Sequence, residues 1–222
     1  MDIKITSEVE MVAGFIANKI INQIDLGKKV LFFASGGSAI AVTSEMAKII
    51  KQHSHQNLTV ILADERFGSI GHKDSNWQQL LDKGFDLPQA KLIPIITGKD
   101  IIETTQEFNV TLEKELKKAD YKIGLFGVGK DGHTAGILRN SEAVKSQNWA
   151  CSHVVPPFER VTITTKTILK LDEAVLWAQG NEKWKIIEEL RDDDIDINTQ
   201  PAQILKKVPI LTIFTDYPGS RV

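Results

Sequence analysis

Short runs of consecutive apolar residues, each followed by a polar loop, are the feature that most limits how this chain can fold. The runs cover Val30 to Ala34, Leu58 to Ala63, Tyr121 to Phe126 and Ala174 to Ala178, with a last one at Val208 to Phe214. Strands without polar alternation are covered on both faces, which is typical of a parallel sheet between two layers of helices. The sequence therefore predicts an α/β fold with a mostly parallel sheet.

Helical periodicity fills several of the segments between these runs. Apolar residues recur at helical spacing from Val9 to Ile24, and Ser7 with Glu10 forms a capping-box pattern before them. Further helices are expected up to about Gln52 and over Glu182 to Arg191. The segments between them contain no Ser/Gly linker, low-complexity tract or repeat, so the rhythm of strand, loop and helix predicts one domain over residues 1–222.

Length and charge restrict the class of protein. The 222 residues equal about 1.5 typical domain lengths. The 27 basic and 29 acidic residues give a formal net charge of −2, so no general attraction to nucleic acid is expected. No apolar run approaches the ~20 residues needed to cross a bilayer, and the start of the chain has no apolar signal core. We expect a cytoplasmic protein that binds neither nucleic acid nor membrane.

The sulfur and imidazole side chains outside the glycine-rich loops give weak signals. Cys151 is the one cysteine, which excludes an internal disulfide and disfavours a sulfur-rich metal site. Cys151 and His153 are expected on one face of a strand without an acidic partner, which disfavours a cysteine hydrolase. His53 and His55 are expected to be exposed in a polar turn.

The first candidate site is the loop Ser35-Gly36-Gly37-Ser38, between a predicted strand and a predicted helix. Two glycines allow successive N–H groups to point at one spot, and the following helix adds the positive end of its dipole. Ser38 adds a hydroxyl donor. The loop is either a phosphate cradle or a tight turn without a ligand.

The second candidate is the segment Asp64-Glu65-Arg66, which runs on to His72-Lys73-Asp74-Ser75-Asn76. Three adjacent charges at the end of a strand need partners or a polar ligand. Arg66 is suited to an anion or a developing oxyanion, and Asp64 to orienting a neighbour. The alternative is a surface ion pair beside a helix N-cap at Asp74 or Ser75. His72 and Asp74 lack a third ligand at suitable spacing, so no metal site is expected.

The third candidate is the glycine-rich loop from Gly127 to Thr134. Its G-x-G-x-x-G pattern resembles a dinucleotide fingerprint, but the loop does not follow the first strand, and no acidic residue ends the next candidate strand. It also lacks the lysine of a P-loop, because His133 stands in that place. A histidine two residues after Asp131 is either structural or a general base whose other nitrogen is held by a carboxylate.

Taken together and in this order, the three loops resemble the 6-phosphogluconolactonase family, within the larger group that includes glucosamine-6-phosphate deaminases. The likeness continues through Arg160-Val161-Thr162-Ile163-Thr164, Gly180-Asn181-Glu182-Lys183 and Pro201-Ala202, and so spans almost the whole chain. It implies a Rossmann-like three-layer sandwich. It also implies hydrolysis of 6-phosphoglucono-δ-lactone to 6-phosphogluconate, in the oxidative pentose phosphate pathway, without metal or organic cofactor.

The resemblance also implies roles for particular residues. His133 matches the general base, and Arg66, Asp131 and Asp64 match polar catalytic residues of the same site, with Arg66 the first choice to stabilise the oxyanion. The residues assigned to substrate binding are those of the phosphate loop, two basic side chains and one histidine: Gly36, Gly37, Ser38, Arg160, Lys183 and His72. The expected partner is a small sugar phosphate, and the expected assembly is a monomer or a small homo-oligomer.

Two positions depart from the family pattern. Ala39-Ile40 replaces the usual Thr-Pro after Ser38, which removes one possible hydroxyl contact to phosphate. Leu138 stands five residues beyond His133, where the deaminases carry a glutamate that supports ring opening and proton transfer. An apolar side chain cannot move protons, so a lactonase is favoured over a deaminase or isomerase. A non-catalytic sugar-phosphate-binding regulator is a further alternative.

Overall fold

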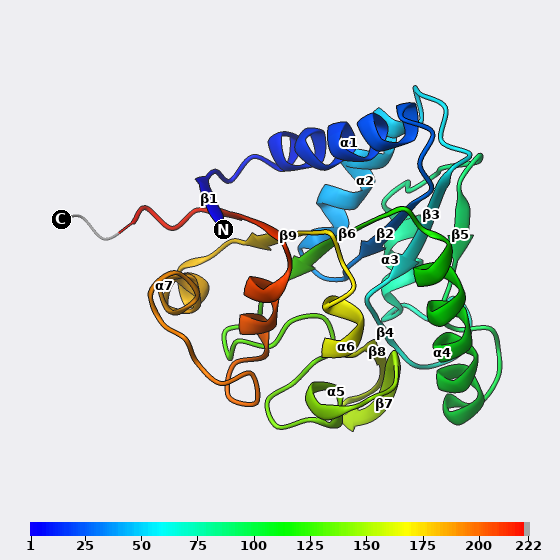
Figure 1. Cartoon of the computed structure of the whole chain (residues 1–222). Coiled ribbons are helices and arrows are strands. Elements are labelled where there is room, and N and C mark those ends of the chain that lie inside the picture. Colours follow the sequence, from blue (N-terminus) through cyan, green and yellow to red (C-terminus); the bar gives the residue numbers. More distant parts are fainter. Residues whose placement is uncertain (220–222) are drawn as a thin grey trace.

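A parallel sheet forms the centre of the molecule in the computed structural model, which describes residues 1–219 (Figure 1). Its seven strands run in the order β1-β10-β9-β6-β2-β3-β5, and every neighbouring pair is parallel. The strands are β1 (Asp2–Ile5), β2 (Val30–Ala34), β3 (Leu58–Leu62), β5 (Lys91–Ile93), β6 (Tyr121–Gly127), β9 (Glu173–Ala178) and β10 (Ile210–Thr215). The predicted α/β fold with a mostly parallel sheet is confirmed.

A second, smaller sheet is antiparallel and has the order β4-β8-β7. Its strands are β4 (Asp64–Arg66), β7 (Ala150–Val155) and β8 (Phe158–Ile163). Strand β4 follows β3 after a single residue, so the chain passes directly from the large sheet into the small one. The segment of three charged residues at the end of β3 is therefore a strand, whereas the sequence predicts a loop there.

Helices cover both sides of the large sheet. In Figure 1, α1 and α2 lie together on one side, and the small sheet lies with α4 and α6 on the other. The helices are α1 (Val9–Asp25), α2 (Ala39–Ile50), α3 (Asn76–Asp82), α4 (Ile101–Lys118), α5 (Glu142–Lys145), α6 (Thr165–Ile168) and α7 (Trp184–Asp192), with two 3₁₀ segments, η1 (Asn181–Lys183) and η2 (Pro201–Lys207).

The central strands are buried, as their composition predicts. All five residues of β2 and all six of β9 are buried, and the largest fully buried side chains include Phe32, Phe33 and Phe126. Because both faces of these strands pack against other elements, polar side chains are confined to the strand ends. This leaves the carboxyl ends of the strands as the place where polar loops gather.

Two expectations about local structure are wrong. Helix α1 begins at Val9, one residue later than the Ser7–Glu10 capping box requires, and the Thr6 hydroxyl instead accepts from the Glu8 N–H. His55 is 1% exposed rather than solvated, because its ring bridges two backbone groups. Its Nδ1 lies 2.8 Å from the His53 carbonyl oxygen, and its Nε2 accepts from the Gln89 N–H at 3.2 Å.

Gly14, in the middle of α1, offers a test of the helix itself. A Cβ built on Gly14 meets nothing within 4 Å, so alanine fits without strain. We expect Gly14→Ala to stabilise the protein by about 0.5–1 kcal/mol, because alanine loses less backbone entropy than glycine in a helix. Urea unfolding measures the change. A lowered unfolding midpoint would contradict the assignment of open space at this position.

Candidate active site

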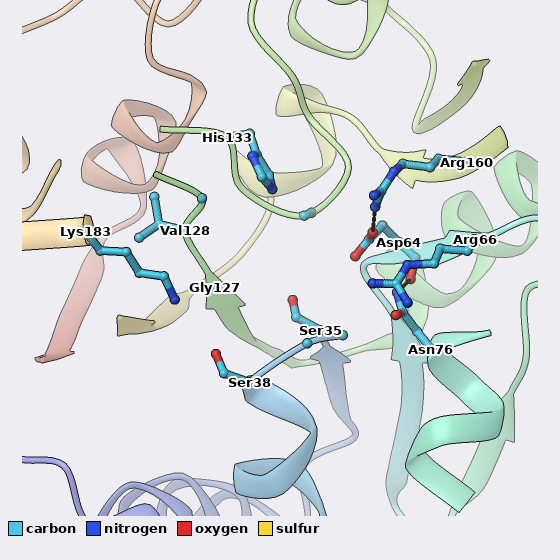
Figure 2. Close-up of a pocket in the computed structure, with 14 residues that line it drawn as sticks. Ser35, Ser38, Asp64, Arg66, Asn76, Gly127, Val128, His133, Arg160 and Lys183 are labelled. Carbon is cyan, nitrogen blue, oxygen red and sulfur yellow. Dashed lines mark hydrogen bonds and ion pairs between the residues drawn. The ribbon is translucent and has the colours of Figure 1, made fainter. Parts of the chain in front are cut away.

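A cavity of about 300 Å³ lies where the carboxyl ends of β2, β6 and β9 meet the small sheet. Figure 2 shows its labelled residues pointing inward from different elements. The residues that line it come from the loops after β2, β6 and β9, from the small sheet and from the start of α3: Ser35, Gly36, Gly37, Ser38, Asp64, Arg66, Asn76, Gly127, Val128, Gly129, His133, Ala135, Arg160 and Lys183. The structure therefore brings the three candidate loops to one place, as the sequence predicts.

His133 and Asp131 form a hydrogen-bonded pair in the loop after β6. Nδ1 of His133 lies 2.6 Å from Oδ1 of Asp131, and the side chain of His133 is 35% exposed. Because a carboxylate oxygen accepts, Nδ1 carries a proton in this hydrogen bond, which makes Nε2 the nitrogen with the free lone pair in a neutral ring. Burial raises the pKa of Asp131, but the charge and hydrogen bonds of His133 outweigh that effect and hold it below its usual value.

The loop that carries this pair has no room for side chains at two of its glycines. A Cβ on Gly129 would lie 2.2 Å from Nδ1 of His133. Gly132 has a φ of +82°, and its carbonyl oxygen accepts from the Ala202 N–H at 2.9 Å. The Asp131 carbonyl oxygen accepts from Nε of Arg139 at 2.6 Å. The histidine–aspartate pair thus requires glycine at position 129, and the left-handed backbone favours glycine at position 132.

The loop after β2 turns sharply into α2. Gly37 has a φ of +62°, which favours glycine, and Ser38 directly precedes the helix. A Cβ on Gly36 would lie 2.2 Å from Oδ1 of Asn76, so the side chain of Asn76 packs flat against this glycine. Asn76 Nδ2 donates to the Asp64 carbonyl oxygen at 3.0 Å and so links the loop after β2 to β4.

Lys183 reaches the same cavity from the turn after β9 (Figure 2). Gly180 adopts a φ of +102°, and its N–H donates to both carboxylate oxygens of Asp216 at 3.1 Å. Trp184 Nε1 donates to the same carboxylate at 3.0 Å. Asp216, just beyond β10, therefore fixes the turn that presents Lys183.

Arg66 and Arg160 enter the cavity from the side opposite Lys183, with His133 between them and Lys183 in the view of Figure 2. Nη1 of Arg160 lies 3.4 Å from Oδ2 of Asp64, and Nη1 of Arg66 donates to the Asp74 carbonyl oxygen at 3.1 Å. Burial raises the pKa of Asp64, although the positive charges of Arg160, His133 and Arg66 oppose the shift. Arg160 and Lys183 thus face one another across the cavity.

Glu65 is 1% exposed and faces away from the cavity, where it fastens β4 to the first turn of α3. Its carboxylate accepts from the N–H groups of Arg66, Asn76 and Trp77 and from the Ser75 hydroxyl, at 2.6–3.0 Å. Burial raises the pKa of Glu65, against the effect of these four hydrogen bonds. The middle charge of the Asp64-Glu65-Arg66 segment is therefore structural, and the two flanking charges face the cavity.

His72 does not line the cavity. Its Nε2 lies 2.9 Å from the Arg66 carbonyl oxygen, and its ring packs so closely on Gly68 that a Cβ there would approach to 3.0 Å. Ser75 caps α3 by accepting from the Gln78 N–H, which decides between the two expected N-caps. The geometry suits His72 to holding the strand that carries Arg66, and its assignment to substrate binding stays a prediction.

Some residues that line the cavity are not among the site residues predicted from the sequence. Ser35 and Asn76 lie in segments that the sequence singles out, but their types alone do not separate them from ordinary turn and cap residues. Ala135 has a φ of +49°, an uncommon backbone conformation for a residue with a side chain. No sequence signal indicates that conformation.

Among the described residues, 1–219, no group of three or more His, Cys, Asp or Glu side chains is placed to hold a metal ion. None of the helices in that part of the chain is both long and apolar enough to cross a bilayer.

The parallel sheet and the cavity at its edge define an α/β enzyme in which a carboxylate-held histidine faces a polar pocket with three basic side chains. The family model described as "Glucosamine-6-phosphate isomerases/6-phosphogluconolactonase" matches residues 6–212. The chain belongs to this family.

Similar proteins from distant organisms agree with the family. A putative 6-phosphogluconolactonase of Caenorhabditis elegans is 25% identical over 194 residues, which cover 81% of this chain and 72% of that protein. A 6-phosphogluconolactonase of Neisseria meningitidis serogroup A is 28% identical over 195 residues, covering 81% of this chain and 82% of the relative.

Solved structures share the fold. The 6-phosphogluconolactonase of Thermotoga maritima superposes with a TM-score of 0.82 at 19% identity, and the match covers 96% of this chain and 98% of that one. A monomeric glucosamine-6-phosphate deaminase superposes with a TM-score of 0.80 at 19% identity, covering 98% of each chain. The fold is thus shared by two activities, and the site must decide between them.

The Glu65 carboxylate predicts a stability effect. Each Glu65 oxygen accepts from at least one backbone N–H, which can only donate, so Glu65→Gln puts its amide NH₂ against such a donor in either orientation. We therefore expect a loss of about 1–3 kcal/mol in the free energy of unfolding. Urea unfolding measures the loss, with the exposed Glu113→Gln as the control, which should change stability by less than about 0.5 kcal/mol. Equal unfolding midpoints for Glu65→Gln and wild type would contradict the role of this carboxylate.

Proposed function

We propose that the protein hydrolyses 6-phosphoglucono-δ-lactone to 6-phosphogluconate. The observation that carries this proposal is the His133–Asp131 pair at the edge of a cavity that also contains Lys183, Arg66 and Arg160. A lactone is an activated ester. Its hydrolysis needs a general base that deprotonates water, a hydrogen-bond donor that stabilises the oxyanion, and a group that binds the remote phosphate. The cavity offers a group for each task.

The phosphate is assigned to the side of the cavity that holds Ser38 and Lys183. A phosphate monoester carries a charge of about −1.5 to −2 at pH 7, which suits a lysine ammonium and the positive end of a helix. Helix α2 begins at Ala39, directly after the turn made by Gly37 and Ser38. Because this chain lacks the threonine of the family pattern, the turn binds the phosphate through its backbone N–H groups and the Ser38 hydroxyl.

The lactone carbonyl is assigned to the opposite side, near His133 and the two arginines. Nε2 of His133 takes a proton from water as the water oxygen bonds to the carbonyl carbon. Arg66, with Arg160 beside it, stabilises the oxygen that gains the negative charge; one such donor contributes about 2.7–4 kcal/mol in comparable sites. Collapse of the intermediate breaks the bond to the ring oxygen, which takes the proton from His133, and the product acid then ionises.

Asp131 and Asp64 act through their neighbours in this scheme. Asp131 fixes the His133 tautomer and stabilises the imidazolium that forms during the attack. Asp64 holds Arg160 by the ion pair at 3.4 Å. The substrate needs no metal, since the guanidinium groups supply the charge that meets the oxyanion.

A deaminase or isomerase activity is less well supported. The position five residues beyond His133 is Leu138, which does not line the cavity and has no proton to transfer. A non-catalytic sugar-phosphate sensor would need a phosphate cradle, but it has no use for a histidine oriented by a carboxylate. Ammonia release from glucosamine 6-phosphate would move the protein to the deaminase branch.

His133→Ala tests the general base. We expect a fall in kcat of about 10²–10⁴, because a positioned base contributes that much to proton transfer. The assay follows 6-phosphogluconate formation from freshly generated lactone and subtracts the spontaneous rate. The exposed His53→Ala is the matched control and should keep wild-type turnover. An unchanged kcat in His133→Ala would remove this residue from the mechanism.

Lys183→Met tests the orientation of the substrate. We expect KM to rise by tenfold or more, about 1.4 kcal/mol of binding free energy, with kcat nearly unchanged, because the lysine contacts a part of the substrate that does not react. The control is Lys185→Met, whose side chain is 81% exposed. A change in kcat alone would contradict the assignment of the phosphate to Lys183. If inorganic phosphate inhibits the wild type but not an Arg160 variant, the substrate binds the other way round, with its phosphate at the arginines.

A further inference from the structure

We propose that Phe158 is a positioning residue that holds Arg66 and Arg160 together at the cavity. This proposal rests on the proposed function, in which these two arginines face the reacting carbonyl. It concerns a residue outside the loops and motifs discussed above. Phe158 begins β8, two residues before Arg160, directly after the turn at Pro156-Pro157.

The two arginines occupy directly opposite positions in the small sheet. Strands β4 and β8 are antiparallel, and their register pairs Arg66 with Arg160. Directly opposed residues project from the same face of a sheet, with Cβ atoms about 4.5–5.5 Å apart. Like charges in such a pair repel one another, so without other contacts the two guanidinium groups would turn apart or out to solvent.

The ring of Phe158 lies beside both guanidinium groups. The Arg66 Cζ lies 5.1 Å from the ring centroid, and the Arg160 Cζ lies 5.9 Å from it. Both distances are within the ~6 Å over which a cation is attracted to an aromatic face. Phe158 is next but one to Arg160 on its own strand and diagonal to Arg66 across the ladder, so one side chain reaches both.

The other contacts of the two arginines do not join them. Arg160 has the Asp64 carboxylate at 3.4 Å, and Arg66 has the Asp74 carbonyl oxygen at 3.1 Å. Within residues 1–219, the buried Nε atoms of both arginines have no hydrogen-bond partner. Among the described residues, the Phe158 ring is thus the side chain in direct contact with both guanidinium groups, while the Asp64 carboxylate attracts both electrostatically.

This shared contact has a consequence for catalysis. A guanidinium group held beside a ring has less freedom to turn, and Figure 2 shows both guanidinium groups directed toward the cavity. Loss of the ring leaves Arg160 with its Asp64 ion pair and Arg66 with the Asp74 carbonyl oxygen, two contacts that do not hold the guanidinium groups to one another. The carbonyl side of the cavity would then lose its preorganisation while the Lys183 side stays intact.

Phe158→Leu and Phe158→Tyr form the test. Leucine keeps an apolar side chain but has no aromatic face, and tyrosine keeps the face. We expect kcat/KM to fall about tenfold in Phe158→Leu, within the range of a partly desolvated cation–π contact, and to return to within about threefold of wild type in Phe158→Tyr. Phe108→Leu, a buried aromatic of α4 outside the cavity, is the matched control and should keep wild-type kcat/KM.

Thermal unfolding and ligand binding complete the test. All variants should unfold as cooperatively as wild type, so that a lower kcat/KM reports the site rather than the fold. Calorimetry with 6-phosphogluconate should show weaker binding to Phe158→Leu and recovery in Phe158→Tyr. This readout decides on Phe158 even if the wild type fails to hydrolyse the lactone, which would overturn the proposed function alone. Wild-type affinity and kcat/KM in Phe158→Leu, or a well-folded Phe158→Tyr that behaves like leucine, would overturn the role of the ring.

Discussion

The parallel direction of all seven strands of the large sheet is the constraint on which the site depends. Because β2, β6 and β9 run the same way, the loops that follow them leave the sheet at one edge. Segments that begin near residues 35, 127 and 180 therefore meet around a single cavity. Strand β4 adds a fourth contribution there, because the chain turns out of β3 into the small sheet instead of returning as a helix.

The charged groups at this edge are held by hydrogen-bonded carboxylates, and each carboxylate fixes a different segment. Glu65 accepts four hydrogen bonds and fixes the start of α3, Asp131 orients His133, and Asp216 fixes the turn of Lys183. A buried charge costs free energy unless it is hydrogen-bonded or paired, so the four hydrogen bonds of the buried Glu65 offset that cost before any ligand binds. The result is a cavity whose acid–base and cationic groups are already in place.

Much of the fold follows from the sequence, because buried parallel strands are marked by uninterrupted apolar runs. Strand β2 has the predicted bounds, and β3, β6, β9 and β10 differ from their predicted bounds by one or two residues. Elements that lack a clear apolar pattern are not predicted from the sequence. Strand β4 consists of three charged residues, and α4 is a largely polar helix whose buried side is narrow.

The candidate site is predicted less evenly than the fold. His133 with Asp131, Arg66, Asp64, Lys183 and the loop at residues 35–38 come together as the family resemblance implies, since their motifs end parallel strands. Arg160 and Lys183, both assigned to substrate binding, lie on opposite sides of the cavity, because the small antiparallel sheet pairs Arg160 with Arg66. Only the three-dimensional register of that sheet reveals such a pair, and the same register reveals Phe158.

The structure of the protein with 6-phosphogluconate bound tests the central claim most directly. The account predicts the phosphate at the Lys183 ammonium and the first turn of α2, and the C1 carboxylate between Nε2 of His133 and the guanidinium groups of Arg66 and Arg160. A product bound with its phosphate on the two arginines, or with its carboxylate out of reach of His133, would contradict it.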